Sequence, residues 1–203
     1  ELAGAMAAAW HAGETERVIA LAASATPSQS EDESVLLLLG LAQQASGRLR
    51  QSAATFRQLT DRHPEVSAYW NNLAVVCREA GELTEAGQAL RTALSLAPDD
   101  AEVHYNLGLL HIQQRQWLLA RESLLDAVEL APSFIEARLQ AAYACHVCGD
   151  HTQQEALLRG APDWPAQPAE QALLLSTMLS VQGDLAGALR TLAHAQLPVA
   201  EPA

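Results

Sequence analysis

The feature that most constrains this chain is a turn residue that recurs every 34 positions. Five of its six occurrences are glycine, and no insertion or deletion interrupts the spacing: Gly13, Gly47, Gly81, Arg115, Gly149 and Gly183. A period of 34 residues is typical of a solenoid built from pairs of helices. Glycine supplies the left-handed conformation that ends the first helix of each pair. A non-glycine residue there costs about 1 kcal/mol, so we expect a locally strained or 3₁₀-like turn at Arg115 but no break.

Further columns of residues keep the same phase. From the second repeat onward, small residues stand seven positions before each turn, and large apolar residues stand nine positions after it. The small residues are Gly40, Ala74, Gly108, Ala142 and Ser176, the apolar ones are Phe56, Leu90, Leu124, Leu158 and Leu192, and Pro64, Pro98 and Pro132 close three units. Small residues let two helices approach closely, apolar residues fill the gap to the next unit, and proline ends a helix. The columns predict an all-α solenoid of antiparallel helix pairs.

The composition agrees with helices and excludes one class of partner. Aromatic residues make up 4% of the chain and apolar residues 49%, with Ala and Leu dominant, which favours tightly packed helices over a sheet. All 12 basic residues are arginine, and 24 acidic residues bring the net charge to -12. Phosphate binding depends on clustered Lys and Arg, so we expect no nucleic-acid partner; a basic protein surface suits the chain better.

Cysteine usage and hydrophobic runs bear on where the protein works. Three cysteines do not form a disulfide framework, which predicts a reducing compartment, the cytoplasm. The chain begins at Glu1 without a methionine, so a trimmed signal and a periplasmic location are the alternative. No run of 18 apolar residues occurs, and we expect no membrane insertion.

Taken together, the columns resemble the tetratricopeptide repeat. The residues of one copy that fall on the signature positions of that family are Trp70, Leu73, Ala74, Gly81, Ala86, Leu90, Ala93 and Pro98. The resemblance implies a right-handed superhelix of about five to six repeats, with an inner groove lined by the first helix of each pair. The expected repeats are 33–64, 67–98, 101–132, 135–166 and 169–200, after a degenerate or capping hairpin at 1–32 and before a Pro- and Ala-rich tail or linker at 197–203. Repeat 135–166 is degenerate, with Arg138 at the Trp position.

The groove can be assigned from helical geometry, because certain positions of each first helix face away from the packing columns. The predicted peptide-binding residues are Leu37, Leu41, Asn71, Asn72, Val75, Arg78, Tyr105, Asn106, Leu109, Ile112, Leu139 and Tyr143. This surface is unusually apolar, and apolar patches commonly mark interaction sites. It predicts a groove for an amphipathic helix or an extended apolar peptide. The alternative is that tight curvature buries these side chains among themselves.

Asparagines contribute the polar part of the predicted groove. Asn72 and Asn106 are equivalent in successive repeats, and this resembles the asparagine ladder of the nucleocytoplasmic glycosyltransferases. Amides can hold a peptide backbone without reading its sequence, although capping of a neighbouring turn explains them equally well. The family's carboxylate clamp for chaperone tails needs Lys and Asn where this chain has Leu37 and Leu41, so we reject that mode.

One cluster has residue types that bind metals. Cys145, His146, Cys148 and His151 contain a C-x-x-C spacing followed by histidine. Cys145 falls late in a predicted helix on a packing column, however, and a single C-x-x-C is a weak signal. Cysteine packs well as a small apolar residue, so we predict packing and no metal site.

The sequence therefore predicts a non-catalytic scaffold that binds a peptide or helix of a protein partner, apolar or amphipathic in character. No glycine-rich phosphate loop, G-x-S-x-G elbow or H-E-x-x-H pair is present, and no cofactor is expected. The alternative is the substrate-docking region of a larger enzyme, such as a glycosyltransferase, sulfotransferase or hydroxylase.

Overall fold

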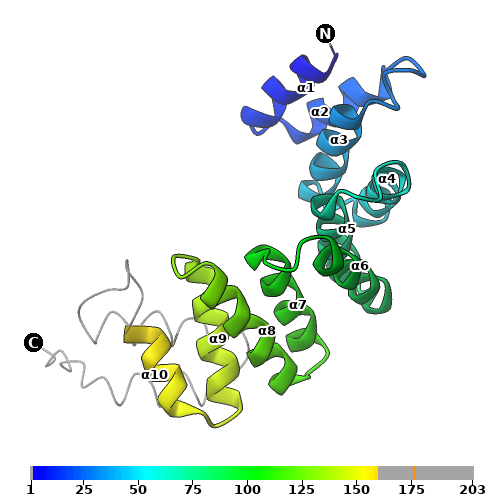
Figure 1. Ribbon diagram of the computed structural model, residues 1–203. Helices are drawn as coiled ribbons and strands as arrows, with labels where there is room; N and C mark the ends of the chain where they lie inside the picture. The colour runs from blue at the N-terminus through cyan, green and yellow to red at the C-terminus, as the bar shows by residue number, and fades with distance from the viewer. Residues whose placement is uncertain (1, 160–175, 177–203) are drawn as a thin grey trace, which may run out of the picture. The chain divides into compact units, whose positions relative to one another are not determined.

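The computed structural model describes residues 2–159 and residue 176, and the described part contains helices and no strand (Figure 1). The helices are α1 (Leu2–His11), α2 (Thr15–Ala23), α3 (Glu33–Ala45), α4 (Leu49–Arg62), α5 (Ser67–Glu79), α6 (Leu83–Leu96), α7 (Ala101–Gln113), α8 (Trp117–Leu130), α9 (Ile135–Val147) and α10 (His151–Arg159). Each odd-numbered helix is joined to the next by a three-residue turn. The predicted all-α helical repeat fold is confirmed.

The chain divides into two compact units after Leu110. The first unit holds α1 to α6 and most of α7, and the second holds the end of α7 together with α8, α9 and α10. No helix of the described residues is both long enough and apolar enough to cross a bilayer. The predicted repeat 169–200 and the tail 197–203 lie outside the described residues except for Ser176, which is helical and 6% exposed. The repeat boundaries themselves stay predictions.

The hairpin turns share one backbone geometry. Gly13, Gly47, Gly81 and Gly149 have φ values of 74°, 72°, 83° and 77°. At Gly81, its N–H donates to the carbonyl of Arg78 at 3.1 Å, and the N–H of Glu82 donates to that of Cys77 at 2.8 Å. These two bonds satisfy carbonyls that a helix end leaves unpaired.

Arg115 adopts the same conformation without being a glycine, with φ at 58°. Its N–H donates to Ile112 at 2.9 Å, and the N–H of Gln116 donates to His111 at 2.8 Å, which repeats the pattern of the glycine turns. The predicted strained turn at Arg115 is therefore confirmed. The turn at Gly183 lies outside the described residues.

The small-residue column brings the helices of a pair into close contact. A Cβ at Gly40 would lie 2.9 Å from the ring of Phe56, so any larger residue there would displace the ring. Ser52 Oγ donates to the carbonyl of Gly40 at 2.7 Å. Phe56, Leu90 and Leu124, from the apolar column, are almost completely buried. These contacts confirm the packing that the columns predicted.

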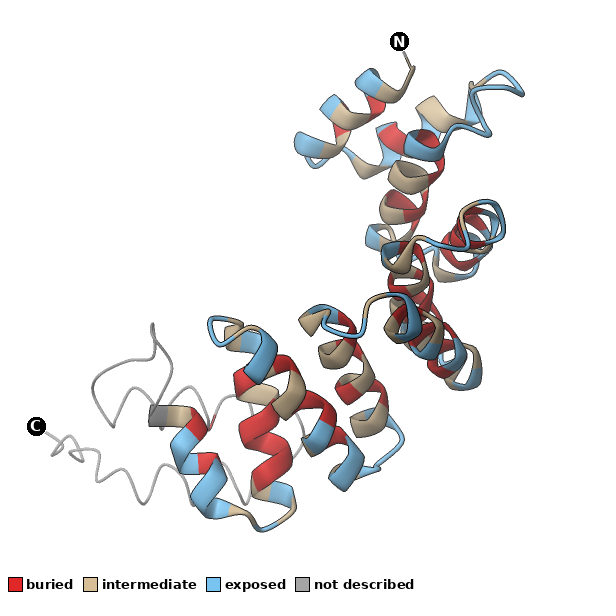
Figure 2. Cartoon of the chain, in the orientation of Figure 1, coloured by how far each residue is buried: buried red, intermediate tan, exposed pale blue. Residues whose placement is uncertain are grey.

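The two units fill their cores with side chains of different size. In the first unit a continuous cluster includes Leu36, Phe56, Leu73, Leu90 and Val103, and a second cluster forms around Met6, Val18 and Val35. In the second unit α9 is buried along most of its length (Figure 2), largely through small residues. These are Ala137, Ala141, Ala142 and Ala144, all fully buried.

A recurring hydrogen bond ties the start of one repeat to the end of the preceding one. The fourth residue of a repeat donates to the carbonyl of the proline six positions earlier: Trp70 Nε1 to Pro64 at 2.8 Å, and Arg138 Nη2 to Pro132 at 2.6 Å. His104 Nε2 does the same to Pro98 at 2.9 Å, and since a carbonyl only accepts, this nitrogen carries the proton. Arg138, whose presence made repeat 135–166 look degenerate, therefore keeps the bond made by Trp70.

Ion pairs join successive second helices at a fixed place. The residue after the turn glycine pairs with a side chain of the preceding second helix: Arg48 with Glu16 at 2.7 Å, Glu82 with Arg57 at 3.0 Å, and Asp150 with Arg121 at 3.5 Å. The charges are reversed in the first of these pairs. Opposite charges thus meet at this position in three hairpins, whereas neutral Gln116 stands there in the hairpin of α7 and α8.

Candidate protein-binding face

The predicted groove residues are divided between the two units. In the first unit they are Leu37 and Leu41 on α3, Asn71, Asn72, Val75 and Arg78 on α5, and Tyr105, Asn106 and Leu109 on α7. Ile112, Leu139 and Tyr143 belong to the second unit. We call the surface formed by Leu37, Leu41, Asn72, Val75, Tyr105 and Leu109 the first-helix face. All six of its side chains are half-buried, so part of each is open to a ligand.

Hydrogen bonds establish that α3, α5 and α7 lie side by side. Near the helix starts, Tyr69 OH donates to Glu33, and Asn71 Nδ2 donates to Glu102 Oε1 at 3.2 Å. Near the helix ends, Gln44 Nε2 donates to Glu79 Oε2 at 3.0 Å. Starts meet starts in both neighbouring pairs and ends meet ends between α3 and α5, so α3 and α5 are parallel; α7 is the first helix of the next repeat and lies beside α5. We refer to these three bonds, together with the bond between Asn71 and Asn106, as the polar ladder.

Asn71 and Asn106 are more enclosed than a solvent-facing groove requires. They are 5% and 6% exposed, and Asn106 Nδ2 donates to Asn71 Oδ1 at 2.9 Å. With its Nδ2 bonded to Glu102, the Asn71 amide uses both of its ends within the protein. The 34-residue spacing of the repeats makes Asn106 equivalent to Asn72, whereas in the structure Asn106 is hydrogen-bonded to Asn71. Tyr143, in the second unit, is also buried, at 5% exposure. Whether the twelve residues bind a ligand stays a prediction.

The ladder fixes acidic groups at the edges of the face. Glu33, Glu79 and Glu102 are exposed, and each accepts its hydrogen bond from a neutral donor on a neighbouring helix. Burial, together with the hydrogen bond to Glu33, raises the pKa of Tyr69 to about 12. The phenol therefore remains a protonated donor throughout the neutral range.

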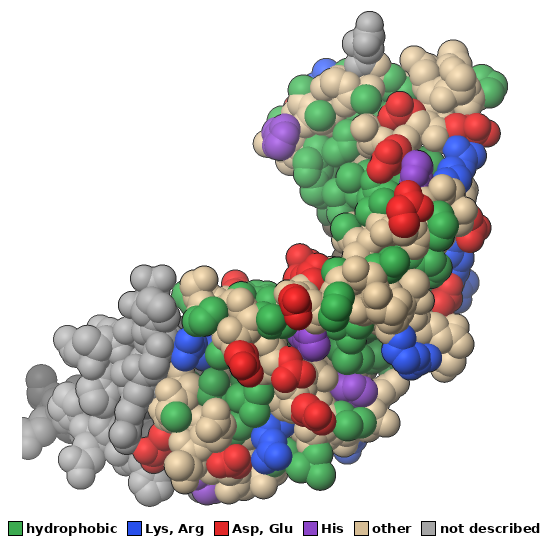
Figure 3. Space-filling model, viewed as in Figure 1, with side chains coloured by type: hydrophobic (Ala, Val, Ile, Leu, Met, Phe, Trp, Pro, Cys, Tyr) green, Lys and Arg blue, Asp and Glu red, His purple; other side chains and the backbone are tan. Residues whose placement is uncertain are grey.

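By contrast, Arg57 on α4 pairs with two carboxylates at the start of α6. Arg57 donates from Nε and Nη2 to the two oxygens of Glu85 at 2.7 and 2.6 Å, and from Nη2 to Glu82 at 3.0 Å. The hydrogen bond from Arg57 lowers the pKa of Glu85, against the opposing effect of burial. Figure 3 shows arginine side chains in blue along the side of the first unit that α4 and α6 form.

The sequence reading missed one group of potential metal ligands beside this ion pair. The ligand atoms of Cys77, Glu82 and Glu85 lie within 4.8 Å of one another. Burial raises the pKa of the Cys77 thiol to about 12, which disfavours its thiolate form. The guanidinium of Arg57 already supplies the cation that faces both carboxylates. We assign the group to helix packing.

The cysteine and histidine cluster of the second unit lies where the sequence predicted. Cys145 is buried within α9, Cys148 caps that helix, and His151 begins α10. Burial raises the pKa of Cys145 to about 11, and the rings of His146 and His151 meet edge to face at 5.8 Å. Their ligand atoms do not form a metal-like group among the described residues, where Cys77, Glu82 and Glu85 alone do so.

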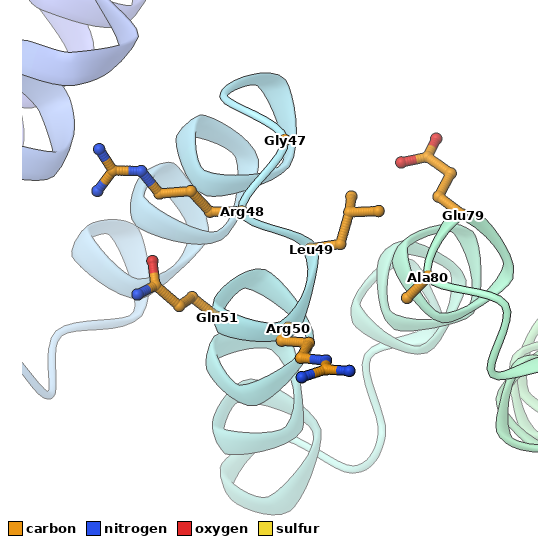
Figure 4. Close-up of a pocket in the computed structure, with 7 residues that line it drawn as sticks. All are labelled: Gly47, Arg48, Leu49, Arg50, Gln51, Glu79 and Ala80. Carbon is orange, nitrogen blue, oxygen red and sulfur yellow. The ribbon is translucent and has the colours of Figure 1, made fainter.

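A surface depression lies near the end of the first-helix face, at the turn between α3 and α4. Its volume is about 570 Å³, and it is lined by Gly47, Arg48, Leu49, Arg50, Gln51, Glu79 and Ala80 (Figure 4). Leu49 and Glu79 face one another across it, whereas Arg48 points away toward its ion pair with Glu16. The depression adds an open hollow beside Glu79 but no convergent set of chemical groups.

Solved structures of similar fold are helical repeat proteins. The chain superposes on pilF of Pseudomonas aeruginosa with a TM-score of 0.73 and 18% identity, covering 94% of this chain and 86% of that one. For MamA of Desulfovibrio magneticus RS-1 the TM-score is 0.69 at 18% identity, over 78% and 89% of the two chains. For YrrB, described as a TPR protein with an unusual peptide-binding site, the TM-score is 0.61 at 18% identity, over 83% and 87%. At this identity the likeness concerns the fold.

Curated relatives are much longer than the matched region. The BBSome complex member BBS4 of Xenopus tropicalis is 29% identical over 126 residues, which cover 62% of this chain and 24% of that protein. The mouse protein, from Mus musculus, is 28% identical over 109 residues, covering 54% and 21%. The chain thus spans about a quarter of the length of these relatives.

The family assignment follows from the repeats themselves. The profile of the tetratricopeptide repeat matches residues 37–101 and 105–169, which together make up more than half of the chain. These segments contain four of the five left-handed turns and the close helix contacts described above. The chain belongs to the tetratricopeptide repeat family.

Proposed function

We propose that this protein is a non-catalytic interaction scaffold whose first-helix face binds a peptide or helix of a partner protein. The observation that carries the proposal is the set of half-buried apolar side chains on three neighbouring helices. Leu37 and Leu41 rest against the core and are thereby held in place, while part of each remains open. An apolar surface that is preorganised in this way loses little entropy on binding.

The neighbouring folds support the same class of activity. The description of YrrB names a peptide-binding site, and BBS4 is a member of a protein complex. The alternative of a docking region within a larger enzyme would use the same surface. The two differ only in what else the open reading frame encodes.

The test selects binders from a random library of 12-residue peptides displayed on phage and measures them against the chain and a double variant, Val75→Asp with Leu109→Asp. Both substitutions place a carboxylate in the middle of the first-helix face, where the residues are half-buried. We expect the dissociation constant of the selected peptides to rise at least about tenfold, equivalent to about 1.4 kcal/mol.

The matched control is Leu118→Asp with Leu119→Asp. These leucines are 66% and 46% exposed on α8, do not belong to the first-helix face, and their substitution changes the net charge by the same amount. Circular dichroism melting checks that each variant is folded. Peptides that bind the double variant as tightly as the parent chain would contradict the proposal.

A further inference from the structure

Arginine is distributed unevenly over the helices of the first unit. Residues 2–110 contain Arg17, Arg48, Arg50, Arg57, Arg62, Arg78 and Arg91. Only Arg78 lies on a first helix; the others lie on α2, α4 and α6 or in the turn before α4. The first-helix side of the unit therefore carries Glu33, Glu79 and Glu102 against a single arginine.

Several carboxylates elsewhere in the first unit are paired with arginine, although Asp61, Glu65 and Asp99 form no ion pair among residues 2–159. Away from the first-helix face, Glu16, Glu31, Glu82 and Glu85 each lie within 3.3 Å of an arginine nitrogen. On the face, Glu33, Glu79 and Glu102 accept hydrogen bonds from a phenol and two amides, and none of the three is in an ion pair within residues 2–159. Neutral donors orient a carboxylate but leave its charge in place.

Each of these three carboxylates has capacity for a further donor. The ladder bonds use one oxygen each, Oε1 of Glu33, Oε2 of Glu79 and Oε1 of Glu102. A carboxylate has two oxygens with about four acceptor sites in total. A cationic donor is the partner that both fills these sites and compensates the charge, since charge-assisted bonds are stronger than neutral ones.

The positions of the three carboxylates frame the apolar residues. Glu33 and Glu102 lie at the starts of α3 and α7, and Glu79 lies at the end of α5. Each of these helices is 13 residues long, which corresponds to about 20 Å. Val75 and Leu109 lie between the two acidic edges. A ligand that fits has an apolar middle and basic side chains toward its ends.

We propose that the first-helix face recognises a basic amphipathic segment of another protein, with Arg or Lys side chains on Glu33, Glu79 and Glu102 and apolar side chains on Val75 and Leu109. The inference rests on the proposed function and adds the charge of the partner. The net charge of -12 favours the same sign of partner, because long-range attraction raises the rate of encounter.

The experiment compares a charge variant with its matched control. In Glu33→Gln with Glu79→Gln and Glu102→Gln, each new amide keeps a carbonyl oxygen that can accept the ladder bond, so mainly the charge is removed. The control, Asp61→Asn with Glu65→Gln and Asp99→Asn, removes the same charge from exposed residues outside the first helices. The full chain is used throughout, with thermal melting to verify the fold.

The probes are 12-residue peptides selected from the random phage library on the parent chain and then synthesised. Among peptides that lose binding to the Val75→Asp, Leu109→Asp variant, we expect more Arg and Lys than Asp and Glu relative to the unselected library. The charge variant should bind them about tenfold more weakly at low ionic strength, and the control should not, since exposed charge pairs contribute up to about 1 kcal/mol each. In the parent chain, raising the salt to about 1 M should weaken binding similarly, because salt screens exposed charges.

The outcomes separate this inference from the proposed function. Face-dependent peptides without a basic excess, or equal binding by the charge variant and its control, would overturn the basic partner and leave the scaffold function standing. A selection that yields no peptide dependent on Val75 and Leu109 would instead count against the binding face itself.

Discussion

The hairpins α5–α6 and α9–α10 share their turn geometry and ion pairs but differ in the side chains that fill their cores. Their turn glycines, Gly81 and Gly149, have φ values of 83° and 77°, and each is followed by an acidic residue paired with an arginine of the preceding second helix. Position seven, however, is Leu73 in α5 and Ala141 in α9, both buried. The shared turns and ion pairs consist of backbone hydrogen bonds and polar contacts, which do not depend on the size of the core residues.

This difference concerns stability more than shape. A fully buried leucine contributes about 1.5 to 3 kcal/mol through removal of apolar surface from water, whereas alanine contributes far less. Each helix buries one tyrosine, Tyr69 or Tyr143, but α9 adds four alanines where α5 adds Leu73 and Val76, so α9 gains less from burial. The comparison predicts that the two hairpins respond unequally to changes in their cores and equally to changes in their turns.

The largest expected effect comes from making α5 resemble α9. Leu73→Ala removes a side chain that is 3% exposed and should lower the free energy of unfolding by about 2 to 5 kcal/mol, measured by urea denaturation. The reverse change, Ala141→Leu, inserts atoms at a fully buried site and should cost about 1 to 3 kcal/mol through overpacking. If Leu73→Ala left the free energy of unfolding unchanged, burial in the core of α5–α6 would not contribute more than burial in α9–α10.

A smaller and equal effect is expected at the two turns. Gly81→Ala and Gly149→Ala place a Cβ where no other atom lies within 4 Å, so the cost is conformational alone, about 1 kcal/mol each. Arg115→Gly is the reverse control and should raise the free energy of unfolding by about 0.5 to 1 kcal/mol, because it relieves the strain of a left-handed arginine. Costs at Gly81 and Gly149 that differ by more than about 1 kcal/mol would show that the turns are not equivalent.

The smallest effect concerns the ion pairs beside the turns. Because Arg57 lowers the folded pKa of Glu85 below its unfolded value, this pair stabilises the protein above about pH 4.3 and the contribution is lost as the pH falls through the folded pKa. The side chains of Arg57 and Glu85 are 41% and 36% exposed, so the contribution should be under about 1 kcal/mol.

The variant Arg57→Gln should therefore show a flatter loss of stability between about pH 5 and pH 3 than the parent chain, in urea titrations at several pH values. Arg91→Gln is the control, since Arg91 forms no ion pair among the described residues and its removal changes the charge equally. An equal pH dependence in both variants would assign the acid sensitivity to other groups.

The helical hairpins and their turns could be predicted from the sequence, because the residues that specify them lie close together in the chain. A left-handed turn, a small residue seven positions before it and a closing proline act within one hairpin, and their spacing survives in the printed residues. The pairing of Asn106 with Asn71 could not be predicted in this way. Successive residues on a helix point about 100° apart, so the choice between Asn71 and Asn72 depends on how each helix is rotated about its axis.

The candidate face was only partly accessible to sequence reasoning for the same reason. Helical periodicity assigned the candidate residues to the first helices, yet it could not separate half-buried Val75 and Leu109 from buried Asn71 and Asn106. The acidic edges could not be found from the sequence either, because their carboxylates are distinguished only by having no arginine partner. Finding that Glu33, Glu79 and Glu102 bond to neutral donors required the positions of all the arginines in the first unit.

In three repeats the fourth residue donates to the preceding proline, and this bond shows what the position requires. Trp70, His104 and Arg138 share neither size, charge nor aromaticity, but each carries an N–H that reaches the same acceptor. The contact requires an N–H within reach of the proline carbonyl, and side chains of three different kinds supply it. A repeat can therefore lack the tryptophan, its most conspicuous residue, and keep the contact that joins it to the preceding repeat.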